Sequence, residues 1–77
     1  MRIIFSSHAK LKIDQRKIPR SYIVDAVTHP DIETSSYNFR IELYKKFRKR
    51  SLKVVAKKEK KSVVIITAHW VEVVKHL

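Results

Sequence analysis

Ser62-Val-Val-Ile-Ile-Thr-Ala-His-Trp70 decides the fold, because it is the strongest strand signal in the chain. Its continuous run of β-branched residues predicts a central strand that is covered on both faces. Leu52-Lys-Val-Val-Ala56 precedes it and predicts a neighbouring strand, with a turn at Lys58-Glu-Lys-Lys61 between the two. These segments predict an antiparallel hairpin in the C-terminal half of the chain.

Further strands are predicted upstream of this hairpin. Arg40-Ile-Glu-Leu-Tyr44 alternates polar and apolar residues and continues through Phe47, so it predicts a strand. Residues 32–36 are compatible with a shorter strand, and Ser35, Ser36 and Asn38 mark the turn that follows. Residues 71–77 fit either a last short strand or a turn of helix.

The N-terminal part of the sequence predicts one strand and two helices. Residues 2–5 are rich in Ile and Phe, and Ser6 or Ser7 is suited to cap a helix over residues 8–17. Pro19 breaks that helix and opens the next, which Pro30 ends. The order β-α-α-β-β-β defines an α+β fold, in which two short N-terminal helices pack on one face of a twisted antiparallel sheet.

Length and composition limit the remaining choices. The 77 residues allow one domain, and 44% apolar residues suffice for a small core. Without cysteine there is no disulfide or thiolate metal site, and without glycine the P-loop and Rossmann phosphate loops are excluded. Turns must instead use Asn, Asp, Ser and Lys, at some cost in strain. No signal peptide or membrane span is evident, so we expect a cytoplasmic protein.

Positive charge is concentrated in one window. Residues 45–61 contain ten basic residues and one acidic residue, Glu59, and so carry +9 of the formal net charge of +11. Apolar residues are interleaved at strand spacing, which predicts folded structure with a cationic surface. Such a surface attracts polyanions, because each cation that neutralises a phosphate releases a counterion. We expect RNA, DNA or an acidic protein as partner; the alternative is a basic protein without an anionic ligand.

Arg48 and Arg50 are the leading candidates for binding phosphate, because a planar guanidinium matches two phosphate oxygens. Their i, i+2 spacing predicts that both lie on the same face of one strand. The alternative is a solvated cationic edge that discourages aggregation. The nucleic-acid-binding surface is expected to include further residues: Arg16, Arg40, Tyr44, Lys45, Lys46, Lys57 and Lys58.

His8 and His69 complete the predicted catalytic set with Arg48 and Arg50, because imidazole titrates near neutral pH. The alternative for His8 is a residue at the start of a helix, hydrogen-bonded to a carboxylate or a backbone group. His69 precedes Trp70. This pair would place an acid–base group beside a stacking platform for a nucleobase, although a core position is favoured for the tryptophan.

Other polar and aromatic residues leave structural alternatives open. Arg16 is expected either to join His8 on one surface or to form an ion pair with Glu42 or Glu72. Tyr44 is expected to contact RNA or to donate a proton. Packing roles are predicted for two tyrosines, Tyr22 and Tyr37, and a frayed position for His76. The histidines and carboxylates are scattered without ligand spacing, so we expect no metal and no cofactor.

The residues also carry a family resemblance. Phe5-Ser-Ser-His8-Ala9, Arg16-Lys17-Ile18-Pro19, Val27 and Pro30 resemble the opening of a small bacterial and archaeal family that typically begins "HA…R.I". Leu52-Lys-Val-Val-Ala56 and Val64-Ile-Ile-Thr67-Ala68 resemble its ending. The family is similar to the RelE/ParE-type toxins, near the BrnT-like branch. Two departures are the missing glycines, in the Arg16-Lys17-Ile18 motif and in the last hairpin.

The resemblance implies two helices on a curved antiparallel sheet, mRNA cleavage and inhibition by a partner antitoxin. Cleavage without a metal needs a base for the 2′-OH, cations for the phosphoryl oxygens and an acid for the leaving oxygen. We therefore expect a toxin-like, metal-independent endoribonuclease that acts on RNA and has an acidic antitoxin as partner. The alternatives are a non-catalytic RNA- or DNA-binding protein and an interaction module that binds an acidic protein.

Overall fold

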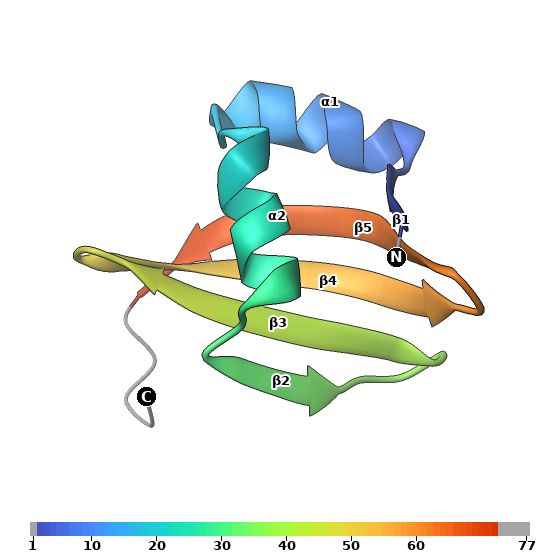
Figure 1. Ribbon diagram of the computed structural model, residues 1–77. Helices are drawn as coiled ribbons and strands as arrows, with labels where there is room; N and C mark the ends of the chain where they lie inside the picture. The colour runs from blue at the N-terminus through green and yellow to red at the C-terminus, as the bar shows by residue number, and fades with distance from the viewer. Residues whose placement is uncertain (1, 73–77) are drawn as a thin grey trace.

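The computed structural model describes residues 2–72, which form two helices and five strands (Figure 1). In chain order they are β1 (Arg2–Phe5), α1 (Ser7–Arg16), α2 (Arg20–Thr28), β2 (Ile32–Ser35), β3 (Arg40–Phe47), β4 (Arg50–Glu59) and β5 (Ser62–Val71). The predicted α+β class and the order of helices and strands are confirmed. The short segment at residues 32–36 forms β2, an additional strand at the edge. Most of residues 71–77, with His76, lie outside the described part.

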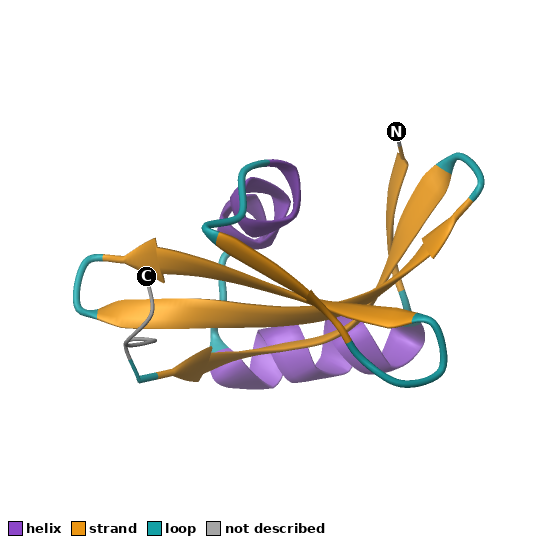
Figure 2. Cartoon of the chain, turned by 90° about the horizontal axis from the view of Figure 1, so that it is seen from below, coloured by secondary structure: helices purple, strands orange, loops and turns teal. Residues whose placement is uncertain are grey.

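The strands form one twisted sheet in the order β1-β5-β4-β3-β2 (Figure 2). β1 is parallel to β5, and every other neighbouring pair is antiparallel. β5 is therefore an interior strand, as predicted, but only over its first half. β1 pairs with Ser62–Ile65, so beyond Ile65 one side of β5 is an edge of the sheet.

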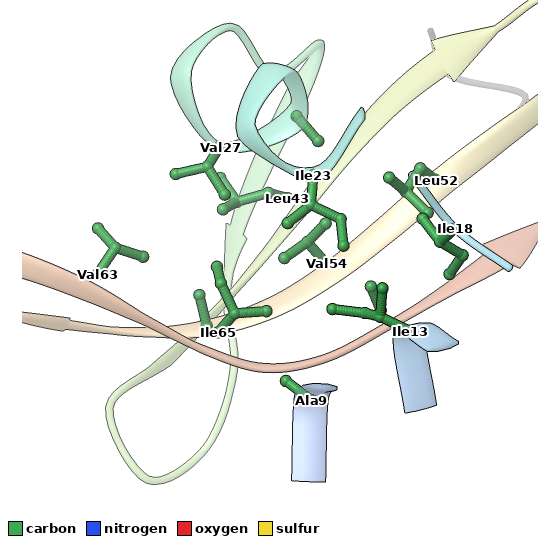
Figure 3. Close-up of a cluster of buried hydrophobic side chains, with 13 residues drawn as sticks. Ala9, Ile13, Ile18, Ile23, Val27, Leu43, Leu52, Val54, Val63 and Ile65 are labelled. Carbon is green, nitrogen blue, oxygen red and sulfur yellow. The ribbon is translucent and has the colours of Figure 1, made fainter. Parts of the chain in front are cut away.

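Both helices cover the same face of the sheet (Figure 1). α1 packs on β5, and α2 packs on β3 and β4. The core between the layers contains Ile13 and Ile23 from the helices and Leu43, Val54 and Ile65 from the strands (Figure 3). We call the opposite side of the sheet the open face.

The prediction that both faces of residues 62–70 are covered is wrong. Val63, Ile65 and Ala68 are buried under the helices, whereas Val64 and His69 stay half-buried on the open face. Isoleucine and valine satisfy the β preference of a strand on either face, so the composition of β5 does not reveal its coverage.

Turns form without glycine, as the composition requires. Lys17 ends α1 in the left-handed conformation with φ of 54°, a position that glycine usually takes. Asn38, Phe39 and Arg48 also have φ near 60° in their hairpins. The turn between β4 and β5 is Lys60-Lys61, shorter than predicted, because Lys58 and Glu59 still pair with β5.

The helix boundaries follow their caps. Ser6 accepts a hydrogen bond from the backbone N–H of Ala9 at 3.1 Å and begins α1. Pro19 is the N-cap of α2, so the predicted break between the helices is confirmed. Within residues 2–72 neither helix is long and apolar enough to cross a membrane.

Candidate functional site

Polar side chains gather on the open face where β3, β4 and β5 lie side by side. Tyr44 is opposite Lys53, and Lys53 is opposite His69, so these three residues form a row across the sheet. Since opposite residues in a sheet share a face, their side chains stand together. With the neighbours described next, they form what we call the open-face cluster: Arg16, Glu42, Tyr44, Lys53, Thr67 and His69.

Glu42 connects two members of the row. The Tyr44 hydroxyl donates a hydrogen bond to Glu42 Oε1 at 3.0 Å, and Lys53 Nζ lies 3.7 Å from Glu42 Oε2. Lys53 Nζ also lies 5.8 Å from the centre of the Tyr44 ring. The side chains of Lys53 and Glu42 remain 24% and 26% exposed, so the cluster is held in place but reachable from solvent.

Arg16 reaches this cluster from the last residue of α1. Its Nη1 donates to the backbone carbonyl of Ala68 at 2.8 Å and to Thr67 Oγ1 at 3.2 Å. The contact forms at the part of β5 that β1 does not pair with, where a backbone carbonyl needs another donor. Neither predicted ion pair of Arg16 is found among the described residues. The remaining guanidinium N–H groups are available for an anion.

The environment shifts two pKa values in the cluster. Burial, and then the positive charges of Lys53 and Arg16, lower the pKa of His69, against a weaker opposing effect of Glu42. Burial and the hydrogen bond to Glu42 raise the pKa of Tyr44, although Lys53 opposes this. Near neutral pH the imidazole is therefore neutral and the phenol is protonated, which suits a base and a proton donor.

The second cationic feature is the hairpin between β3 and β4. Phe47 pairs with Arg50, so Arg48 and Lys49 form a two-residue turn, with Arg48 at φ of 58°. The prediction that Arg48 and Arg50 share a face of one strand is wrong for this reason. Both nonetheless border an open hollow of about 790 Å³, which we call the hairpin hollow; it is lined by Tyr22, Lys46, Phe47, Arg48, Lys49, Arg50 and Trp70.

Three aromatic rings form one wall of the hairpin hollow. Tyr22 stacks on Phe47 with ring centres 4.5 Å apart, and Trp70 meets both rings edge-on at 6.0 and 6.1 Å. Arg50 Cζ lies 4.2 Å from the centre of the Trp70 ring. The predicted packing of Trp70 against the core is confirmed. Its predicted pairing with His69 around one base is wrong, because consecutive strand residues point to opposite faces.

His8 does not join the other predicted catalytic residues. It is exposed in the first turn of α1, which begins beside β1, where the backbone of Ser6 bonds to Ile65. The β3–β4 hairpin lies at the other end of the sheet (Figure 1). Ile65 and Trp70 are five residues apart on β5, which at roughly 3.3 Å per residue is a separation of about 16 Å.

The other predicted contact residues divide between structural and exposed positions. Lys45 Nζ donates to the backbone carbonyl of His29 at 2.9 Å, and Lys58 pairs with Glu33 at 3.0 Å. Arg40, Lys46 and Lys57 are exposed. Tyr22 packs as predicted, but Tyr37 is 85% exposed, so its predicted packing is wrong.

Sequence reasoning missed several members of both sites. Lys53 belonged to the basic window without being singled out, and Glu42 was considered only as a partner for Arg16. Tyr22 and Phe47 were not connected with the basic hairpin. The alternation of side chains along a strand shows which residues of that strand share a face. Only the register between neighbouring strands shows which residues of different strands lie opposite each other. Among the residues that the structure describes, no three His, Asp or Glu side chains are grouped to hold a metal ion.

Fold and surface together define a small α+β domain with a strongly basic hairpin and a polar cluster on its open sheet face. The chain belongs to the family described as "Domain of unknown function (DUF4258)", whose profile matches residues 5–70. Both sites lie within the matched residues. No curated protein and no solved structure matches the chain. The prediction that nearly the whole chain resembles one small family is confirmed to the extent that this profile covers residues 5–70. The wider likeness to RelE/ParE-type toxins stays a prediction.

Proposed function

We propose that this domain is a toxin-like, metal-independent endoribonuclease that cleaves RNA at the open-face cluster. One observation carries the proposal: the imidazole of His69, the phenol of Tyr44 and the ammonium group of Lys53 form a row on the open face, and the guanidinium of Arg16 reaches its edge at Thr67. These are the groups that cleavage by the RNA's own 2′-OH needs. The helix-on-sheet fold and the resemblance to RelE/ParE-type toxins support the same reaction.

In the proposed reaction His69, neutral near pH 7, accepts the proton of the 2′-OH of the RNA. The 2′ oxygen attacks the adjacent phosphorus at the same time. The bond from phosphorus to the 5′ oxygen breaks, and the Tyr44 hydroxyl gives up its hydrogen bond to Glu42 and donates its proton to that leaving oxygen; the phenolate then regains a proton from solvent. Lys53 and Arg16 stabilise the negative charge that develops on the phosphoryl oxygens. Glu42 orients Tyr44 and Lys53. The products are a 2′,3′-cyclic phosphate and a 5′-hydroxyl.

A partner protein is also proposed. The formal charge of +11 favours an acidic antitoxin, because opposite charges steer two proteins together and raise their association rate. A small acidic protein encoded beside this one would fit that role.

A second candidate is non-catalytic RNA or DNA binding. The observation that favours it is the location of the basic hairpin, whose cations border the hairpin hollow rather than the open-face cluster. A pure interaction module for an acidic protein is the third candidate, and copurification with RNA but no protein would count against it. Binding that weakens steeply with salt, with no cleavage at any pH, would favour the second candidate.

The test is RNA cleavage by purified protein in EDTA, with the ends of the products identified chemically. Two variants, His69→Ala and Lys53→Ala, should each lose roughly 10²-fold or more of the rate, the range for acid–base and electrostatic groups. Lys60→Ala removes the same charge from the β4–β5 turn and should keep nearly the full rate. Equal cleavage by wild type and by a folded His69→Ala/Lys53→Ala variant would reject the proposal.

A further inference from the structure

We infer that the hairpin hollow binds one unpaired nucleobase and its adjoining phosphate, so that the domain takes single-stranded RNA rather than a duplex. The inference rests on the proposed interaction with RNA, but not on cleavage. Three features of the hollow support it: exposed aromatic surface, an arginine fixed on a ring, and uncompensated positive charge.

The aromatic wall gives a base something to stack on. Tyr22 lines the hollow and is 38% exposed although its ring is stacked on Phe47, so this aromatic residue is accessible to a ligand. Every nucleobase has a π-face, and stacking on an aromatic side chain is tolerant of sequence. Bases in a duplex are already stacked on each other and do not present this face.

Arg50 is arranged to hold the phosphate next to such a base. Its guanidinium carbon lies 4.2 Å from the centre of the Trp70 ring, so the ring attracts the cation through its π-system. A cation–π contact does not consume the N–H donors of the guanidinium, and Arg50 forms no ion pair within residues 2–72, so its planar fork of donors remains available for a ligand. A fork of this shape matches two oxygens of one phosphate.

The charge of the hollow points to an anionic ligand. Of its seven lining residues four are cationic, namely Lys46, Arg48, Lys49 and Arg50, and none is acidic. Within residues 2–72 none of these four side chains forms an ion pair. Cations gathered without counter-charges repel each other, and a phosphate would relieve that repulsion while releasing counterions.

The position of the hollow fits a strand that continues to the open face. Trp70 and His69 are consecutive on β5, opposite Leu52 and Lys53, so the hollow and the open-face cluster lie on opposite sides of the same part of the sheet. β5 is an edge strand there, since β1 pairs only as far as Ile65. A flexible single strand can pass around this edge and reach both sites.

The experiment compares two single strands of about eight nucleotides, both 2′-O-methylated so that they cannot be cleaved. One carries uracil bases and the other has the same backbone without bases. Wild type should bind the uracil strand about tenfold more tightly than the abasic strand. The fluorescence anisotropy of labelled strands measures both affinities. Trp70 is the only tryptophan, so its fluorescence should report the base directly.

The Tyr22→Leu variant should keep its affinity for the abasic strand and lose most of the tenfold preference. Tyr37→Leu is the matched control, because it removes an equally large ring from an exposed loop and should keep the preference. If Tyr22→Leu does not fold, Arg50→Lys tests the hollow instead: it keeps the charge, loses the fork, and should weaken binding of the uracil strand several-fold.

Each outcome decides between the claims. Equal affinity of wild type for both strands, or tighter binding of a duplex or of an oligoglutamate peptide, overturns the inference. Base preference without RNA cleavage leaves the inference standing and rejects the endoribonuclease. Cleavage without base preference rejects the inference about the hairpin hollow and leaves the endoribonuclease standing.

Discussion

At the scale of single residues, Lys53 is the central charge of the open-face cluster. Its ammonium group is shared between the Glu42 carboxylate at 3.7 Å and the Tyr44 ring, while His69 stands opposite it on β5. A half-buried cation attracts the carboxylate and disfavours protonation of the imidazole. The same lysine can therefore stabilise a phosphoryl oxygen and keep the neighbouring base unprotonated.

Replacing Lys53 by Gln should raise the pKa of His69. In the wild type that pKa lies below the ordinary 6.5, because burial and the charges of Lys53 and Arg16 disfavour the imidazolium, while Glu42 favours it. Removing one of the two cations leaves the carboxylate less opposed, so the imidazole holds its proton to higher pH. Titration of the His69 ring protons by NMR measures the change directly.

Lys60→Gln is the control for this titration. Lys60 lies in the β4–β5 turn, remote from His69, so the effect of its charge on His69 is largely screened. If His69 acts as the base, cleavage should fall as pH decreases through its pKa, since protonation removes the acceptor. Lys53→Gln should then move this acidic limb to higher pH. A limb that stays in place while the NMR titration moves would exclude His69 as the base.

At the scale of elements, the hairpins show how the chain turns without glycine. The β2–β3 turn places Asn38 and Phe39 at φ of 59° and 60°, closed by hydrogen bonds between Ser36 and Arg40 and between Arg40 and Tyr37. Asparagine tolerates the left-handed region, whereas a bulky side chain such as that of Phe39 is strained there. Phe39 is also 89% exposed, so its ring makes few packing contacts that could offset the strain of the left-handed conformation.

Phe39→Gly should therefore stabilise the fold by about 0.5–1 kcal/mol, since Asn-Gly is the preferred pair for such a turn. Relief of left-handed strain of about 1–2 kcal/mol exceeds the entropy that glycine adds to the unfolded chain. Denaturant unfolding measures the difference. Phe39→Ala keeps the β-carbon and should stay close to wild type; an equal gain in both variants would assign the effect to the exposed ring instead.

The N-cap of α1 provides a second test of local structure. Ser6→Ala removes the acceptor for the Ala9 N–H and should destabilise the protein by about 1 kcal/mol. Ser7→Ala changes the next serine, which is exposed inside the helix and should have little effect. Thermal unfolding of the two variants distinguishes them, and equal stabilities would mean that the cap contributes nothing measurable.

The elements were predictable to the extent that their signals are local. Pro19 separates the helices, Ser6 caps α1, and the β-branched run forms β5, each within a few residues of its signal. The turns were less predictable, because the length of a hairpin loop depends on pairing. Phe47 and Arg50 pair directly, so Arg48 became a turn residue despite its strand-like neighbours. A single sequence does not contain that register.

At the scale of the whole molecule, the open-face cluster draws on residues from four elements. Arg16 comes from α1, Glu42 and Tyr44 from β3, Lys53 from β4, and His69 from β5. Their meeting requires the β3-β4-β5 order and also an early end of β1, which exposes the Ala68 carbonyl to Arg16. Such long-range conditions explain why Arg16, Tyr44 and His69 were each predicted as site residues, whereas their grouping around Lys53 and Glu42 was not.

The net charge makes a prediction about the whole molecule that is independent of function: NaCl should raise the Tm. At about 0.01 M salt the Debye length is roughly 30 Å, comparable to the longest dimension of 32 Å. Every cation in a chain of net charge +11 then repels the others, whereas at about 0.15 M screening leaves only near neighbours within about 8 Å.

The two ion pairs found among the described residues, Lys53–Glu42 and Lys58–Glu33, are partly exposed and lose little on screening. Relief of self-repulsion therefore outweighs them, and the Tm should increase between these salt concentrations. A Lys60→Gln/Lys61→Gln variant lowers the charge of the β4–β5 turn without touching either site. It should be more stable than wild type in low salt and gain less from added NaCl. A Tm that falls with salt in wild type would show that attractive pairs, rather than the excess of cations, dominate the electrostatics of this fold.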